Sequence, residues 1–282
     1  MQNGTASVSA TTSSEAPALS EATASPLAER FAVLRKKGRR ALVVYVTAGY
    51  PDPPTSLVLL RALEQSGADV VEVGVPFSDP MADGPVIQAS SQRALEHGVT
   101  FDRVLELISR ASLGVPVVLF SYLNPVLAAG TDALERASRA GAHGVLITDL
   151  PVGSDPALEE RFAAGPLAFV RLVAPTTPTE RMAHIVRHGS GFVYLISRLG
   201  VTGARDELPP ELPATIARLR QATGGGLPIC VGFGVSTPAQ AASVARLADG
   251  VVVGSAIVRA AGESVGKAAA LTTQLRDAID KA

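Results

Sequence analysis

From Pro26 onward the chain alternates between two patterns of apolar residues. Short, mostly β-branched apolar runs predict strands, whereas longer stretches in which apolar residues recur every three or four positions predict amphipathic helices. Eight strands are predicted, at Leu42–Thr47, Val70–Gly74, Val117–Ser121, Gly144–Thr148, Ala168–Val173, Phe192–Ile196, Pro228–Val231 and Gly250–Gly254. Many of them are apolar on both faces, which is typical of a parallel sheet covered by helices.

Helices are predicted between the strands and at both ends of this region. Their expected ranges are Pro26–Lys37, Thr55–Gln65, Phe101–Ser112, Asp132–Ala140, Pro156–Ala164, Thr179–His188, Leu212–Ala222, Pro238–Leu247 and Val265–Lys281, with a further helix starting near Pro85. Eight strands alternating with helices favour a closed (β/α)8 TIM barrel over an open doubly wound sheet, and no G-x-G-x-x-G turn follows the first strand. The first and last helices are expected to cap the ends of the barrel.

Composition changes the picture at the N-terminus. Residues 1–25 are mostly Ala, Ser and Thr and contain no Lys or Arg, so we expect a disordered tail ahead of one catalytic domain at residues 26–282. A targeting peptide usually carries basic residues, and the acidic residues Glu15 and Glu21 count against one. We therefore expect a cytoplasmic enzyme with a dispensable tail.

Charge and cysteine content exclude several classes of function. The balance of 25 Lys and Arg against 26 Asp and Glu argues against nucleic acid or an anionic membrane as the main partner, because both select a basic surface. No apolar run approaches the ~18 residues of a membrane-spanning helix. The single cysteine, Cys230, lies in an apolar run and is expected to be a packed thiol rather than a nucleophile.

The second predicted strand carries a carboxyl group in an apolar setting. Strand side chains alternate, so Val71 and Val73 share one face and Glu72 lies on the other. Helices must cover the outer face of a barrel, which assigns the valines outward and Glu72 inward. Burial there is expected to raise the pKa of Glu72. Either Glu72 is held by a structural hydrogen bond or it takes part in chemistry at the strand ends.

The loop after this strand carries a second candidate carboxylate. Asp83 lies eleven residues after Glu72 and just before Gly84-Pro85, where an aspartate could also serve as a turn residue or helix cap. Asp79, in front of Pro80 in the middle of the loop, is expected to be structural.

Three later strands end in glycine-rich segments that could expose backbone amides to a phosphate. They are Gly200-Val201-Thr202-Gly203, Gly232-Phe233-Gly234 and Gly254-Ser255, and a helix is expected to start at the last of them. Glycines allow close approach of a ligand, and the amides at a helix N-terminus attract a dianion. Because these segments fall at one end of the barrel, where such folds commonly bind phosphate, the sequence predicts a phosphate site.

The run PFSDPMADGPVIQ resembles the signature of the tryptophan synthase alpha chain family, and so do YLISRLGVTGAR, GFGVSTPAQ and VVVGSAIV. The likeness spans from about Leu27 to the C-terminus. It implies a lyase that cleaves indole-3-glycerol phosphate, with Glu72 and Asp83 as the catalytic pair. It also implies phosphate binding by Gly203, Gly234, Gly254 and Ser255, and a mobile lid containing Thr202. The implied indole pocket is lined by Tyr45, Phe120, Tyr122, Leu146 and Tyr194.

The resemblance also implies an assembly. Members of the family pair with a beta chain as an α2β2 heterotetramer, and pyridoxal phosphate belongs to that partner, so no cofactor is expected on this chain. Two departures are small: Leu199 stands where smaller or polar residues are common, and Tyr50 stands where Asp is frequent.

Several alternatives to a tryptophan synthase alpha chain remain open. The chain could be a stand-alone lyase that releases free indole, or a regulatory partner without catalysis, although the presence of both Glu72 and Asp83 argues against the latter. His184 and His188 have the spacing of two metal ligands on a helix. No Glu follows His184, however, and their helix is expected to pack outside the barrel, so no metal site is predicted. A metal-dependent sugar-phosphate epimerase would need inward His and Asp ligands on early strands, which the sequence lacks.

Overall fold

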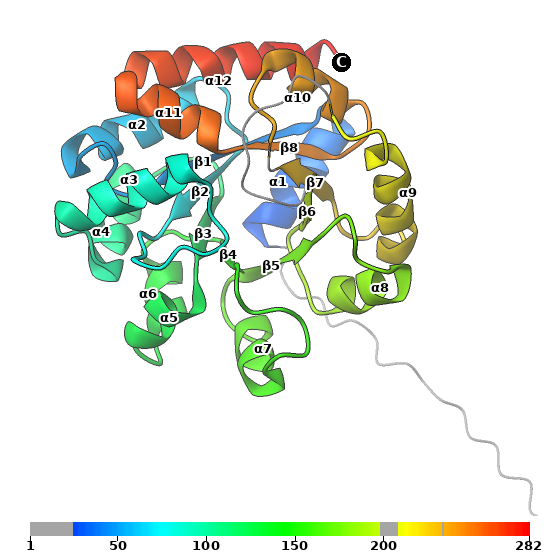
Figure 1. Ribbon diagram of the computed structural model, residues 1–282, viewed down its shortest axis with the longest axis horizontal. Coiled ribbons are helices and arrows are strands. Elements are labelled where there is room, and N and C mark those ends of the chain that lie inside the picture. Colours follow the sequence, from blue (N-terminus) through cyan, green and yellow to red (C-terminus); the bar gives the residue numbers. More distant parts are fainter. Residues whose placement is uncertain (1–24, 198–207, 233) are drawn as a thin grey trace, which may run out of the picture.

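The computed structural model describes residues 25–197, 208–232 and 234–282, which build a closed barrel of eight parallel strands (Figure 1). The strands pair in sequence order, and the eighth closes the ring against the first. They are β1 (Ala41–Thr47), β2 (Val70–Gly74), β3 (Val117–Ser121), β4 (Gly144–Ile147), β5 (Ala168–Val173), β6 (Val193–Ile196), β7 (Ile229–Gly232) and β8 (Gly250–Val253). The predicted TIM barrel is confirmed, and each strand begins and ends within one residue of its predicted bounds.

The helices surround this barrel and cover the outer faces of the strands (Figure 1). In the described residues they are α1 (Pro26–Lys36), α2 (Pro53–Gln65), α3 (Pro85–Glu96), α4 (Phe101–Ala111), α5 (Leu123–Ala128), α6 (Ala133–Arg139), α7 (Pro156–Ala163), α8 (Thr179–Arg187), α9 (Leu212–Thr223), α10 (Pro238–Ala245), α11 (Ser255–Glu263) and α12 (Val265–Asp280). Every predicted helix is present. The short helix α5 was not predicted, because six residues with one buried side chain carry too little period to be recognised.

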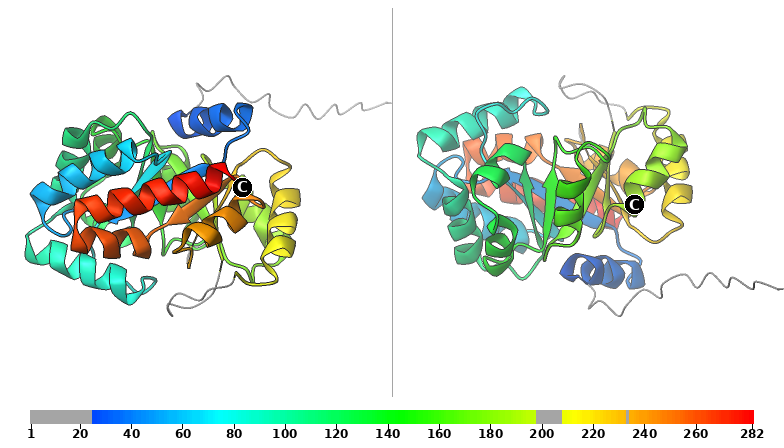
Figure 2. Two further views of the ribbon diagram at one scale, coloured as in Figure 1. Left: turned by 90° about the horizontal axis from the view of Figure 1, so that it is seen from above. Right: turned by 90° about the horizontal axis from the view of Figure 1, so that it is seen from below.

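The first helix, α1, closes the N-terminal end of the barrel, as predicted. It lies across one end of the strands (Figure 2), and its buried residues Leu27, Phe31 and Leu34 join the cluster inside the barrel. The Phe31 ring contacts that of Phe192 at 5.6 Å between centroids. The N-cap residue of α1 is Ser25, whose hydroxyl accepts a hydrogen bond from the Ala28 amide. The rest of the predicted tail lies outside the described residues.

The last helix, α12, does not cap an end of the barrel, and that part of the prediction is wrong. It runs along the outside, packed on α2, α10 and α11 and against β1 (Figure 1). The short helix α11 directly follows β8, so the chain needs α12 to cover the outer face where β8 meets β1. Its buried residues Ala268, Thr272, Leu275 and Ile279 recur every three or four positions, which fits one face packed on the sheet.

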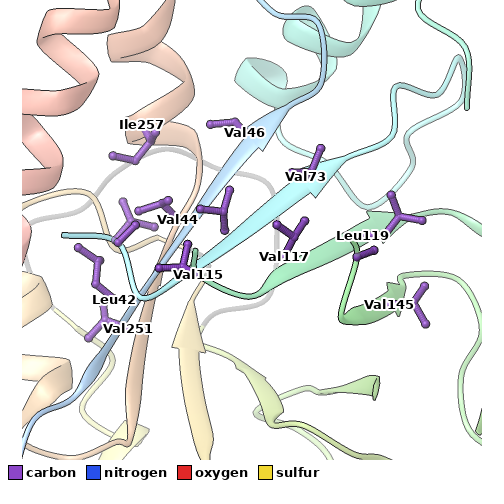
Figure 3. Close-up of a cluster of buried hydrophobic side chains, with 14 of the residues drawn as sticks. Leu42, Val44, Val46, Val73, Val115, Val117, Leu119, Val145, Val251 and Ile257 are labelled. Carbon is purple, nitrogen blue, oxygen red and sulfur yellow. The ribbon is translucent and has the colours of Figure 1, made fainter. Parts of the chain in front are cut away.

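One apolar layer covers the outer face of the sheet and a second fills its inner face. Outward side chains, among them Val44, Val73, Leu119 and Val251, pack beneath the helices (Figure 3). The alternate residues of the same strands point inward and form a second cluster. Because Val71 and Val73 belong to the outer layer, the strand alternation places Glu72 inside the barrel, as predicted.

Candidate active site

Glu72 lies within the barrel, and no described residue forms a hydrogen bond with its carboxyl group. Its backbone is in register with Tyr45 on β1 and with Val118 on β3, both of which have inward side chains. The residue is only 1 % exposed, and neither of its carboxyl oxygens has a hydrogen-bond partner among the residues that the structure describes. Burial raises the pKa of Glu72 from its ordinary 4.5 to about 8. A structural hydrogen bond, the alternative left open by the sequence, is therefore not found in this part of the chain.

Asp83 lies on the β2–α3 loop, with its carboxylate turned to another loop rather than to its own helix. The N-cap of α3 is Gly84, and the Asp83 carboxylate accepts a hydrogen bond from the hydroxyl of Tyr122, with 3.1 Å between Oη and Oδ2. The side chain of Gln88 instead donates to the Asp83 carbonyl. This arrangement removes the helix-capping interpretation of Asp83. Asp79 is exposed and accepts a hydrogen bond from Ser78 beside it.

The two carboxyl groups differ in charge at neutral pH. Burial raises the pKa of Asp83 to about 6, and the hydrogen bond from Tyr122 partly opposes this rise. Asp83 is therefore mostly ionised at pH 7, whereas Glu72, with a pKa of about 8, mostly holds its proton. A rise for Asp83 was not expected from the sequence, but the order of the two pKa values is the expected one. Such a pair offers one proton donor and one anion.

Aromatic and aliphatic side chains form the inner wall around Glu72. Tyr45, Phe120, Leu146 and Tyr194 are all buried and all belong to the inward-facing cluster. The rings of Tyr45 and Phe120 meet edge to face with 5.2 Å between centroids. Tyr122 contacts the ring of Phe77 on the β2–α3 loop at 5.1 Å. Of the predicted pocket and lid residues, Thr202 lies outside the described residues.

Glycines on the inner faces of two strands make room for these rings, a role that sequence reasoning missed. A Cβ atom at Gly74 would lie 2.1 Å from the hydroxyl oxygen of Tyr45, and one at Gly232 would lie 2.3 Å from that of Tyr194. Both glycines end a strand; the sequence predicted Gly74 as a strand residue and Gly232 as part of a phosphate-binding segment. The signal is visible only once the register places each tyrosine beside its glycine.

The predicted phosphate-binding segments that the structure describes lie after β7 and β8. Gly234 is exposed and has a φ of 102°, a conformation that favours glycine. Gly254 is the N-cap of α11 and Ser255 is its first residue. The N-cap residue makes no side-chain hydrogen bond to the first amides of this helix. By contrast, Thr237 and Gln240 cap α10 with their own side chains. Gly203 lies outside the described residues, as do Arg198, Leu199 and Arg205.

No metal site is evident in the described part of the chain. His184 and His188 lie together on α8, with 4.7 Å between ring centroids, but no third His, Cys, Asp or Glu among the described residues completes a group with them. Cys230 is fully buried inside the barrel, and burial raises the pKa of its thiol well above the ordinary value. This environment agrees with the packed thiol that was predicted.

None of the described helices is both long enough and apolar enough to cross a membrane.

Fold and site together define a class: a (β/α)8-barrel enzyme with two buried carboxyl groups of raised pKa, one in the barrel and one on the loop that follows. The sequence profile described as "Tryptophan synthase alpha chain" matches residues 31–281. The chain belongs to the tryptophan synthase alpha chain family, as the sequence motifs predicted.

Individual relatives agree with this assignment. The tryptophan synthase alpha chain of Citrifermentans bemidjiense is 47 % identical over 238 residues, covering 83 % of this chain and 88 % of the relative. That of Gluconacetobacter diazotrophicus is 48 % identical, covering 83 % and 86 %. Among solved structures, tryptophan synthase from Mycobacterium tuberculosis superposes with a TM-score of 0.83 at 38 % identity, covering 91 % of this chain and 98 % of that one. The alpha subunit from Legionella pneumophila gives 0.83 at 35 % identity, covering 92 % and 99 %.

Proposed function

We propose that this chain is the alpha subunit of a tryptophan synthase and cleaves indole-3-glycerol phosphate into indole and D-glyceraldehyde 3-phosphate, a step of L-tryptophan biosynthesis. The observation that carries the proposal is Glu72: a buried carboxyl group with no partner among the described residues and with a pKa of about 8. An uncompensated carboxyl group inside an apolar barrel destabilises the fold, and its pKa suits proton transfer near neutral pH.

The reaction is a retro-aldol cleavage in which Glu72 moves one proton. The protonated carboxyl group first donates to C3 of the indole ring, which becomes an indolenine-like cation. The resulting carboxylate then takes the proton of the side-chain hydroxyl next to C3. The C–O bond becomes the aldehyde carbonyl while the electrons of the breaking C–C bond return to the ring. Glu72 ends protonated, as it began.

Asp83 stabilises the positive charge that develops on the ring. Its ionised carboxylate accepts the indole N–H while C3 is protonated, and this interaction strengthens as the nitrogen becomes positive. A pKa of about 6 leaves Asp83 ionised at neutral pH. The inner wall is suited to a flat aromatic ring, because it is formed by the aromatic and aliphatic side chains of Tyr45, Phe120, Leu146 and Tyr194.

The phosphate of the substrate binds to backbone amides at the ends of the later strands. Gly234, Gly254 and Ser255 are at least partly exposed there. The start of α11 adds the favourable dipole of a helix N-terminus. In the proposed site Gly203 adds a further amide and Thr202 closes toward Asp83.

The proposed reaction requires no cofactor on this chain, because the indole ring itself receives the electrons. The partner is a tryptophan synthase beta chain, which carries pyridoxal phosphate and completes an α2β2 heterotetramer. The proposed location is the cytoplasm. The presence of both carboxyl groups with separated pKa values argues against a purely regulatory subunit.

The pH dependence of kcat/KM tests the assigned protonation states. Catalysis needs Asp83 ionised, so activity falls as the pH drops below about 6. It also needs Glu72 protonated, so activity falls as the pH rises above about 8. The expected profile is a bell with its maximum near neutrality, measured by indole release in overlapping buffers. A profile that keeps rising above pH 9 would contradict the role of Glu72 as the acid.

The decisive experiment measures indole release from indole-3-glycerol phosphate by the purified chain, with and without a tryptophan synthase beta chain. Slow release that rises strongly with the beta chain supports both the reaction and the assembly. Fast release that is indifferent to the partner supports a stand-alone lyase. No release under either condition contradicts the proposed reaction.

A further inference from the structure

A chain of hydrogen bonds links Asp83 to the loops after β3 and β4, and Tyr122 makes its contact with Asp83. The Tyr122 hydroxyl donates to Asp83 Oδ2 at 3.1 Å and accepts a hydrogen bond from the Ala82 amide at 2.9 Å. One hydroxyl therefore holds both the carboxylate and the backbone next to it. The Tyr122 ring also contacts Phe77, which lies six residues before Asp83 on the same loop.

The position of Tyr122 is itself held from the next strand. Tyr122 follows β3 and is the N-cap residue of α5, but its side chain does not cap that helix. The first amide of the helix, at Leu123, instead donates to Oδ1 of Asp149 at 2.7 Å, and Asp149 follows β4. A carboxylate after β4 thus fixes the start of α5, and the start of α5 fixes the hydroxyl that reaches Asp83.

We propose that Tyr122 and Asp149 are positioning residues for the cleavage reaction: Asp149 fixes Tyr122, and the Tyr122 hydroxyl holds Oδ2 of Asp83 so that Oδ1 is directed to the indole N–H. This inference rests on the proposed function. It changes the role of Tyr122 from a wall of the indole pocket to the residue that orients the anion. Asp149 becomes part of the site although it is exposed and far from Asp83 in sequence.

The electrostatics of the loops agree with this geometry. The hydrogen bond from Tyr122 lowers the pKa of Asp83 against the effect of burial. Among the described residues, Tyr45 on β1 also interacts electrostatically with Asp83. The charge of Asp149 interacts in the same way with Tyr122. Loss of the Tyr122 hydroxyl therefore raises the pKa of Asp83, and less of the carboxylate is ionised at a given pH.

The first test replaces Tyr122 by Phe, which keeps the ring against Phe77. We expect kcat to fall about tenfold to a hundredfold, the range for a hydrogen bond to a charged group, with a smaller change in KM. The acid limb of the kcat/KM profile should move upward by about one pH unit. The substrate phosphate also titrates near pH 6, but it is common to all variants, so only the displacement between them is informative.

The second test separates the Asp149 acceptor from its charge. Asp149→Ala removes both and should move the acid limb upward, with a smaller loss of kcat than Tyr122→Phe. Asp149→Asn removes the charge but keeps an oxygen for the Leu123 amide, so its acid limb should stay close to that of the wild type. If charge alone mattered, both variants would shift the limb alike and toward lower pH, and that result would overturn the role of Asp149.

A matched control is Asp155→Ala. Asp155 caps α7 by accepting a hydrogen bond from the Leu158 amide, much as Asp149 accepts one from the first amide of α5. Among the described residues, no hydrogen bond joins Asp155 or α7 to Tyr122 or Asp83. This variant should lose a comparable amount of stability and keep the wild-type pH profile. An equal shift in Asp155→Ala would show that general loosening moves the limb, and it would overturn the proposal.

A readout without turnover separates this inference from the proposed function. The Asp83 carboxyl carbon is titrated by 13C NMR in the full chain, with its signal assigned through Asp83→Asn. An upward shift of the Asp83 pKa in Tyr122→Phe supports the positioning role, and an unchanged pKa overturns it. A wild-type chain that releases no indole, even with the beta chain, instead overturns the proposed function.

Discussion

One buried carboxyl group lies just before strand β2 and another lies within it, and the two differ in their hydrogen bonding. Asp69 comes just before the strand, at the end of the barrel closed by α1, and Glu72 lies three residues further along. Each is only 1 % exposed. Asp69 Oδ1 accepts a hydrogen bond from Arg30 at 2.7 Å, and Oδ2 accepts from the Leu42 amide at 2.9 Å and from Arg276 at 2.6 Å. Glu72 has no such partner among the described residues.

Asp69 stabilises the fold through its hydrogen bonds, whereas Glu72 is buried without such a contribution from the described residues. Asp69 ties α1, β1 and α12 to the start of β2 through hydrogen bonds that satisfy its charge. Glu72 makes no comparable bond to any described residue, and burial raises its pKa to about 8. In barrels of this kind one end serves stability and the other chemistry, and the proposed role of Glu72 agrees with that division.

The largest expected effect comes from Glu72→Gln, which keeps the shape of the side chain and removes its proton transfer. Indole release should fall by about 10² to 10⁴-fold or more, because a positioned acid–base group contributes that much. Circular dichroism and thermal unfolding should show an intact fold at neutral pH. Turnover close to wild type would contradict the catalytic role of Glu72.

Asp69→Ala should give the converse result, with a large loss of stability. It leaves the buried guanidinium of Arg276 without its main partner and the Leu42 amide without its acceptor. Breaking a buried ion pair typically costs about 3–5 kcal/mol. Urea unfolding measures the loss, and kcat per folded molecule should stay near wild type. A selective loss of kcat without a loss of stability would contradict the structural role of Asp69.

The pH dependence of stability distinguishes the two carboxyl groups further. The folded-state pKa of Glu72, about 8, lies above its ordinary 4.5, so the folded chain keeps a proton that the unfolded chain releases. The stability contributed by this protonation is complete below about pH 4.5 and is lost as the pH rises toward 8. Glu72→Gln does not titrate, so relative to wild type it should gain about 3 kcal/mol between pH 5 and pH 8. Parallel stability curves for the two proteins would contradict the raised pKa.

The smallest effect is expected from Glu106→Ala, which serves as the control for Asp69. Glu106 and Arg110 form an ion pair on the surface of α4 at 3.4 Å, with both side chains more than 60 % exposed. An exposed pair of this spacing contributes at most about 0.5 kcal/mol. Urea unfolding under the conditions used for Asp69→Ala should barely change. A loss as large as that of Asp69→Ala would remove the distinction between buried and exposed pairs.

Much of the barrel could be read from local pattern because its strands are apolar and its turns rich in glycine and proline. The inward direction of Glu72 followed from the alternation with Val71 and Val73, which requires no knowledge of distant residues. The position of α12 could not be read in this way, because an amphipathic period states that one face is buried but not against what. The partners of Asp69 were also hidden, since Arg30 and Arg276 lie 39 and 207 residues away in the chain.

Sequence by itself determined the order of the elements, the face on which Glu72 lies and the family to which the chain belongs. These depend on periodicity and motifs, which are local properties. Only the tertiary structure decided that Asp69 is satisfied while Glu72 is left without a partner in the described chain, that Asp83 meets Tyr122, and that Gly74 and Gly232 make room for two tyrosines. Those outcomes depend on which atoms the closed barrel brings within a few ångströms, because hydrogen bonding, desolvation and steric fit act only at that range.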